Sequence, residues 1–229
     1  MTLHPGMEFR EVHRGPASSD SIFQVRCDPA RTRLGLVWAK DYGQSVLPVA
    51  ELTKRSGCWA AVNGGYFDPK SEPMGYQRDA IRVVSHDLRT AGLFGGVFVV
   101  GPRGADLLGR EDFVASAYSF ALQCGPRLIF RGEKVKGIHA DPPARRTGMG
   151  VDRQGRIFLY ATGLTARFTF AQTQAWLNGP VAQGGLEPSG VLNLDGGSST
   201  QFSVNTPSLK EDVPGWARVP VAVGIFPSR

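Results

Sequence analysis

The sequence is poor in cysteine, with three residues in 229, and they stand far apart at Cys27, Cys58 and Cys124. No CxxC pair or Cys/His cluster accompanies them, which argues against a structural zinc site. An odd number leaves at least one thiol unpaired. Cys27 and Cys58 could form a disulfide if their strands were neighbours, but the favoured interpretation is three buried free thiols.

Long hydrophobic runs are also missing. No apolar stretch approaches the roughly 18 residues of a membrane-spanning helix, so no membrane span is expected. The N-terminal MTLHPGMEFREV has no signal-peptide hydrophobic region. The protein is therefore either cytoplasmic or, as an alternative, periplasmic or otherwise extracytoplasmic with its leader absent from this chain. Its oligomeric state cannot be read from the sequence.

Strong charge of one sign is absent as well. The 26 basic and 20 acidic residues give a net charge of +6, and the basic residues are scattered without interleaved aromatics. This pattern argues against nucleic acid as a partner and suits an anionic small substrate or a glycan. The chain also lacks GxSxG, P-loop, GxGxxG and HExxH motifs, which removes the commonest hydrolase and nucleotide-binding classes.

Glycine and proline are abundant, with 29 and 16 residues, and such a content predicts many tight turns between short strands. Helical spacing is limited to residues 49–57, to the region around 170–177 and, ambiguously, to residues 113–125. We expect hairpins over residues 127–135 and 147–163, and a hairpin or near-neighbour pair over 21–39. The prediction is a single α+β domain over residues 1–229, with a mixed, mostly antiparallel sheet and a few flanking helices.

Two apolar runs end in the same unusual way. VLNLDGGSST stops at Asp195 before Gly196 and Gly197, and WAAVNGGYFD stops at Asn63 before two further glycines. A carboxylate at the mouth of a buried strand is partly desolvated, so its pKa can be tuned for catalysis. An amide can both donate and accept hydrogen bonds to a sugar or phosphate oxygen. The alternative is a pair of ordinary D-G and N-G turns.

Other polar residues also adjoin predicted strands. The segment ARRTGMG places Arg145, Arg146 and Thr147 directly before a strand, where an arginine fork and a hydroxyl can bind phosphate. A double arginine is otherwise a solvated surface feature. The segment QCGPRLI is favoured as a plain turn. His139 and Asp141 in IHADPP could form an acid–base pair, although the scatter of the four histidines gives this little weight.

Four segments, AAVNGGYFD, QCGPRLI, RRTGMGVDRQGRIFLYATG and VLNLDGGSSTQF, occur in this order. Together they resemble the phosphodiester glycosidase domain family, and the resemblance covers most of the chain. It implies an α+β fold and hydrolysis of a sugar-1-phosphodiester, of which an N-acetylglucosamine derivative is one example, in glycan, exopolysaccharide or cell-envelope metabolism. It favours a periplasmic or extracytoplasmic location and a carbohydrate or sugar-phosphate partner. Many relatives have a third glycine where this chain has Ser198, and substrate specificity is expected in residues 76–89.

The resemblance and the residues together assign a site. The catalytic group would comprise Asp195, Arg146, Asn63 and Thr147. Asp195 would be the base for water or the nucleophile, Arg146 would neutralise the departing phosphate, and Asn63 and Thr147 would orient sugar or phosphate oxygens. The expected substrate-binding residues are Gly64, Gly65, Tyr66, Phe67, Gln123, Gly125, Gly196, Gly197, Ser198 and Ser199.

A second carboxylate is not evident, although glycosidases usually have a pair. A phosphate monoester is a good leaving group, which lessens the need for a strong general acid. No cofactor and no metal ligand are expected, since the sequence shows no convincing cage of oxygen ligands for a divalent cation. Two alternatives remain at this stage: a non-catalytic glycan-binding or sugar-phosphate-binding module, and a phosphodiesterase that cleaves the P–O bond.

Overall fold

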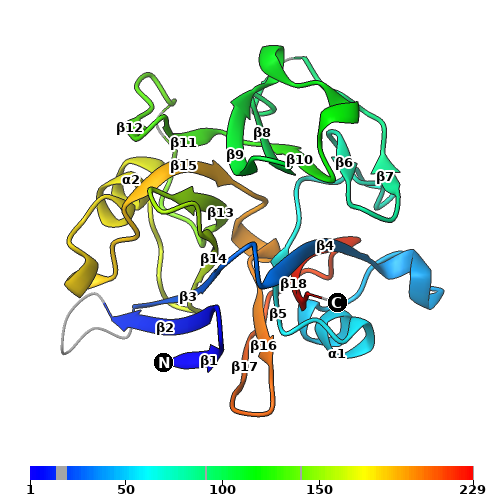
Figure 1. Ribbon diagram of the computed structural model, residues 1–229, viewed down its shortest axis with the longest axis horizontal. Coiled ribbons are helices and arrows are strands. Elements are labelled where there is room, and N and C mark those ends of the chain that lie inside the picture. Colours follow the sequence, from blue (N-terminus) through cyan, green and yellow to red (C-terminus); the bar gives the residue numbers. More distant parts are fainter. Residues whose placement is uncertain (14–19, 91, 140, 229) are drawn as a thin grey trace.

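Three β-sheets meet at the centre of the molecule, and two α-helices cover outer faces (Figure 1). A computed structural model describes residues 1–13, 20–90, 92–139 and 141–228. Every strand pairing within these residues is antiparallel. The expectation of a mostly antiparallel sheet core with a few helices is confirmed in that respect. The expected mixture of parallel and antiparallel pairs is wrong for the described residues, and the fold is mainly β.

The largest sheet has eight strands. Their order is β1 (Thr2–His4), β2 (Met7–His13), β3 (Ser21–Cys27), β14 (Ile157–Thr162), β13 (Thr147–Asp152), β15 (Pro188–Asn193), β11 (Arg127–Phe130) and β12 (Glu133–Lys134). The second sheet has the order β7 (Val83–Ser85), β6 (Gln77–Arg78), β10 (Phe120–Cys124), β8 (Gly96–Gly101) and β9 (Gly104–Gly109). The third has the order β17 (Lys210–Val213), β16 (Phe202–Asn205), β5 (Ala60–Asn63), β18 (Val221–Pro227) and β4 (Thr32–Trp38).

Both helices occupy the positions that the sequence predicted. Helix α1 (Val49–Ser56) ends at Gly57, whose left-handed φ of 71° lets its N–H bond the Thr53 carbonyl. Helix α2 (Phe170–Leu177) begins with a capping box between Thr169 and Gln172. No helix among the described residues has the length and hydropathy needed to cross a bilayer.

The main core fills the space where the three sheets face one another. It includes Val25, Met149 and Leu192 of the first sheet, Phe98 and Leu122 of the second, and Val62 and Val223 of the third. Strand β14 is buried on both faces, which explains its continuous apolar sequence. Its Leu159 points into this core, whereas Phe158 and Tyr160 point outward beneath α2. Helix α1 covers the outer face of the third sheet.

Two local predictions were wrong. Residues 21–28 and 33–39 do not form a hairpin, because β3 pairs with β2 and β14 while β4 pairs with β18 in a different sheet. Residues 113–125 are not a helix, since two short 3₁₀ turns precede strand β10. In β10, Phe120 and Leu122 face the main core and Ala121 faces the opposite side, an alternation too short to recognise in the sequence.

The remaining local predictions were confirmed. The β11–β12 hairpin turns at Arg131 and Gly132, both with positive φ. The β13–β14 hairpin turns after Asp152, which accepts the N–H of Gly155. All three cysteines are free and buried, as the favoured interpretation held.

Candidate functional site

The two Gly-Gly segments lie against each other. Asn63 is the last residue of β5, and its Nδ2 donates to the carbonyl oxygen of Asp195 at 2.7 Å. The Asp195 N–H in turn donates to the Gly64 carbonyl oxygen at 3.3 Å. Segments 132 residues apart in the chain therefore form neighbouring walls of one region.

The start of β13 lies beside the same region, because β13 and β15 are antiparallel and Gly148 is opposite Asn193. The Gly197 N–H donates to the Arg145 carbonyl oxygen at 2.9 Å. A Cβ on Gly196 would lie 2.9 Å from that same oxygen. The close approach of the two backbones explains a glycine at position 196, and the left-handed φ of 60° explains the next one at Gly197.

Asn63 and Thr147 are bonded to each other inside the protein. The Thr147 hydroxyl donates to Asn63 Oδ1 at 2.8 Å, and the Gln201 N–H donates to the same oxygen at 3.0 Å. Both side chains are completely buried. We expected them to orient substrate oxygens, but their hydrogen bonds are made within the fold. Their position makes them positioning residues, which fix the loop that carries Asp195.

Replacement of Thr147 by valine is expected to lower the free energy of unfolding by about 1–2 kcal/mol, since it removes one buried hydrogen bond at nearly constant volume. Thr147→Ser keeps the hydroxyl and should lose less. Urea denaturation of the two variants provides the measurement. Equal stabilities of the valine and serine variants would contradict a stabilising role for the bond to Asn63.

A pocket of about 580 Å³ opens beside these segments. Four of the expected site residues line it, namely Tyr66, Arg146, Gly196 and Gly197. Asp195 lies between the lining residues Asn193 and Gly196. The Tyr66 hydroxyl donates to the Gly125 carbonyl oxygen at 2.6 Å, which fixes its ring at the pocket wall.

The Asp195 carboxyl is half-buried, and this desolvation raises its pKa above the usual aspartate value. Hydrogen bonds from the Ser199 hydroxyl and the Gly196 N–H act in the opposite direction, because they stabilise the carboxylate. A partly desolvated carboxylate held by two donors has the properties of a base or nucleophile that works near neutral pH.

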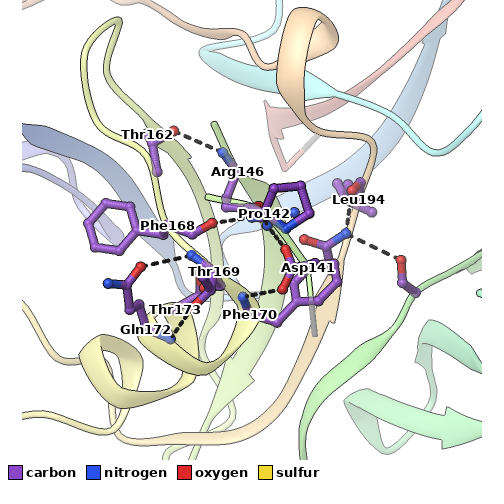
Figure 2. A network of polar contacts seen from close by, with 12 residues as sticks. Asp141, Pro142, Arg146, Thr162, Phe168, Thr169, Phe170, Gln172, Thr173 and Leu194 are labelled. Carbon is purple, nitrogen blue, oxygen red and sulfur yellow. Dashed lines mark hydrogen bonds and ion pairs between the residues drawn. The ribbon is translucent and has the colours of Figure 1, made fainter. Parts of the chain in front are cut away.

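Arg146 lies at the centre of a polar network (Figure 2). Its Nε donates to the Phe168 carbonyl oxygen at 2.7 Å, and its Nη2 donates to the Pro142 carbonyl oxygen at 3.1 Å and forms an ion pair with Asp141. Its guanidinium carbon lies 4.2 Å from the centre of the Phe170 ring. Among the residues that the structure describes, Nη1 has no protein partner. This nitrogen is thus free to bind an anion in the pocket.

The sequence suggested Asp141 only as an acid–base partner of His139 and did not single out Asn193, yet both Asp141 and Asn193 line the pocket. Asp141 accepts the Phe170 N–H at 3.0 Å and so connects Arg146 to the start of α2. The single polar letter in the apolar run VLNL was the signal that could have identified Asn193. Further cations, Arg127 and Lys136, line the same pocket together with His139.

Arg145 does not form a phosphate-binding fork with Arg146. Its guanidinium is buried and donates to the carbonyl oxygens of Gly163, Pro214 and Thr162. Burial lowers its pKa to about 10, with a smaller contribution from the positive charge of Arg167.

Gln123, an expected substrate-binding residue, does not line the pocket. It is completely buried, and its amide bonds the backbone of Tyr76, Arg89 and Phe94. It therefore anchors the segment whose residues Gly92, Leu93 and Gly95 line the pocket. Residues 76–89, where specificity was expected, contribute no lining residue to this pocket.

The other expected binding residues lie behind or beside the pocket. Phe67 packs against the core beneath α1. A Cβ on Gly64 would lie 2.9 Å from the Val221 carbonyl oxygen, and Gly65 is buried near Cys124. The carbonyl of Gly125 accepts the Tyr66 and Asn193 bonds, while Ser198 is exposed. These residues shape the loops and do not line the pocket themselves.

A larger open groove of about 1520 Å³ lies elsewhere, along β2 and α2. It contains none of the expected site residues. We assign the site to the smaller pocket because that pocket combines Arg146 with the loop of Asp195. Within residues 1–13, 20–90, 92–139 and 141–228, no group of three or more His, Cys, Asp or Glu side chains is arranged to hold a metal ion.

Comparison with known proteins adds independent information. The family model described as phosphodiester glycosidase matches residues 56–226. Among curated proteins, none matches the sequence.

Solved structures show the same fold at low sequence identity. The catalytic domain of zebrafish N-acetylglucosamine-1-phosphodiester alpha-N-acetylglucosaminidase, auto-inhibited by its pro-peptide, matches with a TM-score of 0.70 and 15% identity over 99% of this chain and 86% of that chain. A hypothetical protein from Synechocystis matches with a TM-score of 0.68 and 16% identity, over 98% of this chain and 62% of that one. A Burkholderia pseudomallei protein assigned as exported has a TM-score of 0.59 and 13% identity, with 93% and 75% coverage.

Proposed function

Because the chain belongs to the phosphodiester glycosidase family, we propose that it hydrolyses the bond between the anomeric carbon of a sugar and a phosphodiester oxygen. The observation that carries the proposal is the pocket lined by Arg146 and by Gly196 and Gly197, which follow Asp195 in its loop. Among the described residues, Nη1 of Arg146 has no protein partner. Arg127 and Lys136 add positive charge to the same lining. Such a surface attracts a phosphodiester anion.

The proposed reaction breaks one C–O bond. Water attacks the anomeric carbon, Asp195 accepts a proton from the water, and the phosphate monoester departs with the bonding electron pair. In a variant of this scheme, Asp195 attacks the anomeric carbon itself and water then hydrolyses the glycosyl ester. Arg146 stabilises the negative charge on the leaving phosphate. Asn63 and Thr147 act indirectly, by fixing the loop that carries Asp195.

The substrate would be a sugar-1-phosphodiester of the kind named for the zebrafish relative, an N-acetylglucosamine derivative being one member. A role in exopolysaccharide or cell-envelope metabolism, outside the cytoplasm, is consistent with the relative assigned as exported. The binding-module alternative is disfavoured, because a lectin has little use for a carboxylate of raised pKa on a loop that borders the pocket of Arg146.

The test is incubation of the purified protein with a panel of sugar-1-phosphodiesters, including UDP-sugars, in ¹⁸O-labelled water. We expect release of reducing sugar with the label on the sugar. Label on the phosphate would indicate P–O cleavage instead. Ligand-induced thermal stabilisation without any release would indicate a binding module, and neither release nor stabilisation would count against the proposed substrate class.

A further inference from the structure

Three polar side chains surround Gly148 on the outer face of the eight-stranded sheet. Gly148 is directly opposite Tyr160 in β14 and Asn193 in β15. Directly opposed residues of antiparallel strands point to the same face, with Cβ atoms about 4.5–5.5 Å apart. Arg146 precedes Gly148 by two residues, so it shares this face. Phe158 and Val191, which pack outward beneath α2, confirm the direction.

The glycine makes room for the tyrosine. A Cβ at position 148 would lie only 2.5 Å from the Tyr160 hydroxyl oxygen. The phenol ring therefore extends across Gly148, from β14 toward the strand that carries Asn193. Any larger residue at 148 would force the ring out of this position.

Two polar atoms at this place are buried without a hydrogen-bond partner in the part of the chain that the structure describes: the Tyr160 hydroxyl and Asn193 Oδ1. The orientation of the Asn193 amide is fixed, because its Nδ2 donates to the carbonyl oxygens of Gly125 at 3.2 Å and Leu194 at 2.6 Å. Oδ1 is consequently the free acceptor. Unpaired buried polar groups are rare in native proteins, and in a lining residue of a pocket they indicate a ligand.

We propose that Tyr160 and Asn193 form a subsite that recognises one hydroxyl group of the sugar; this inference rests on the proposed function. A hydroxyl can donate to Asn193 Oδ1 and accept from the Tyr160 phenol at the same time, whereas an amide N–H can satisfy only the first. Asn193 and Arg146 both line the pocket, and Tyr160 is completely buried behind this lining, against Gly148. The subsite would thus lie at the floor of the pocket, next to the guanidinium that is proposed to bind phosphate.

The test on the protein uses Tyr160→Phe, with Tyr118→Phe, which lies between a 3₁₀ turn and β10, as the control. Because the Tyr160 hydroxyl has no protein partner, Tyr160→Phe should leave the melting temperature of the free protein unchanged or raise it. It should lower kcat/KM for the sugar-1-phosphodiester about tenfold. A lowered melting temperature with unchanged kcat/KM would mean that the hydroxyl makes a structural bond, and would overturn the proposal.

The ligand side uses deoxy and deoxyfluoro analogues of the best substrate with the unmodified protein and with Tyr160→Phe. One deoxy analogue should react about tenfold more slowly than its parent in the unmodified protein, and this penalty should largely disappear in Tyr160→Phe. If every penalty is the same in both proteins, the subsite is refuted while the glycosidase function stands. If the unmodified protein releases no sugar and binds no sugar phosphate, the proposed function itself has failed.

Discussion

Asp195→Asn is expected to lower kcat for sugar release by about 10²–10⁴-fold, the contribution typical of a positioned base. Asparagine has nearly the same shape, and its amide oxygen can still accept a hydrogen bond from the Ser199 hydroxyl or the Gly196 N–H. The loss would thus come from the missing negative charge. For the unmodified enzyme, the acidic limb of the kcat/KM profile should lie above the usual aspartate pKa, because burial raises the pKa of Asp195.

The same substitution should stabilise the protein at neutral pH. A carboxyl whose pKa is higher in the folded state favours folding in its protonated form, so ionisation costs stability once the pH exceeds the folded pKa. The cost disappears below the unfolded pKa, where the group is protonated in both states. Asp195→Asn should therefore melt at a higher temperature than the unmodified protein at pH 7, and this difference should shrink as the pH falls through that window.

The control is Asp112→Asn, which changes an exposed carboxyl in a 3₁₀ turn far along the chain from the site loop. It should not alter the turnover. Full activity in Asp195→Asn would show that another group activates the water, and the assigned role of Asp195 would then be wrong.

Arg146→Lys should lower kcat/KM about 10²–10³-fold, the magnitude seen when one preorganised donor to a developing anion is lost. A lysine retains the charge but has no planar fork. It cannot bond the Phe168 carbonyl oxygen, pair with Asp141 and bind a phosphate oxygen at once. Arg103→Lys, at an exposed turn, is the matched control and should behave as the unmodified enzyme. The measurement is kcat/KM of both variants for one phosphodiester, obtained by steady-state kinetics.

Measurements of the free energy of unfolding distinguish a loss of catalysis in Arg146 variants from misfolding. Arg146→Met should destabilise the protein by up to about 3 kcal/mol, because it leaves the largely buried Asp141 carboxylate without its partner. Adding Asp141→Asn should recover part of that stability while the activity stays low. If the double variant regains activity as well, Arg146 serves the fold and not the leaving phosphate.

The elements that could be predicted were those encoded locally. Both helices carry their own end signals, Gly57 in one case and the Thr169–Gln172 capping box in the other. The two Gly-Gly segments were recognisable because each ends an apolar run with a polar residue. Their contact through Asn63 and Asp195 agrees with the expectation that they border one region.

What could not be predicted depends on how three sheets meet. Gln123 and Thr147 carry functional groups that could bind a substrate. Only the packing shows that these groups form hydrogen bonds within the protein instead. Asp141 is hidden in an irregular segment between strands, and it reaches Arg146 only because that segment folds over the start of α2. The predicted pairing of β3 with β4 was wrong for the same reason, because β3 pairs with β14 and β4 pairs with β18, both distant in the sequence.

The 132 residues between Asn63 and Asp195 also have a consequence for the newly made chain. A ribosome adds about 5–20 residues per second, so Asn63 is made roughly 7–26 seconds before its partner Asp195. Strand β18, which pairs with β5 and whose Val221 carbonyl receives the Gly64 N–H, arrives later still. During translation both edges of β5 therefore stay unpaired until β16 and β18 have been made.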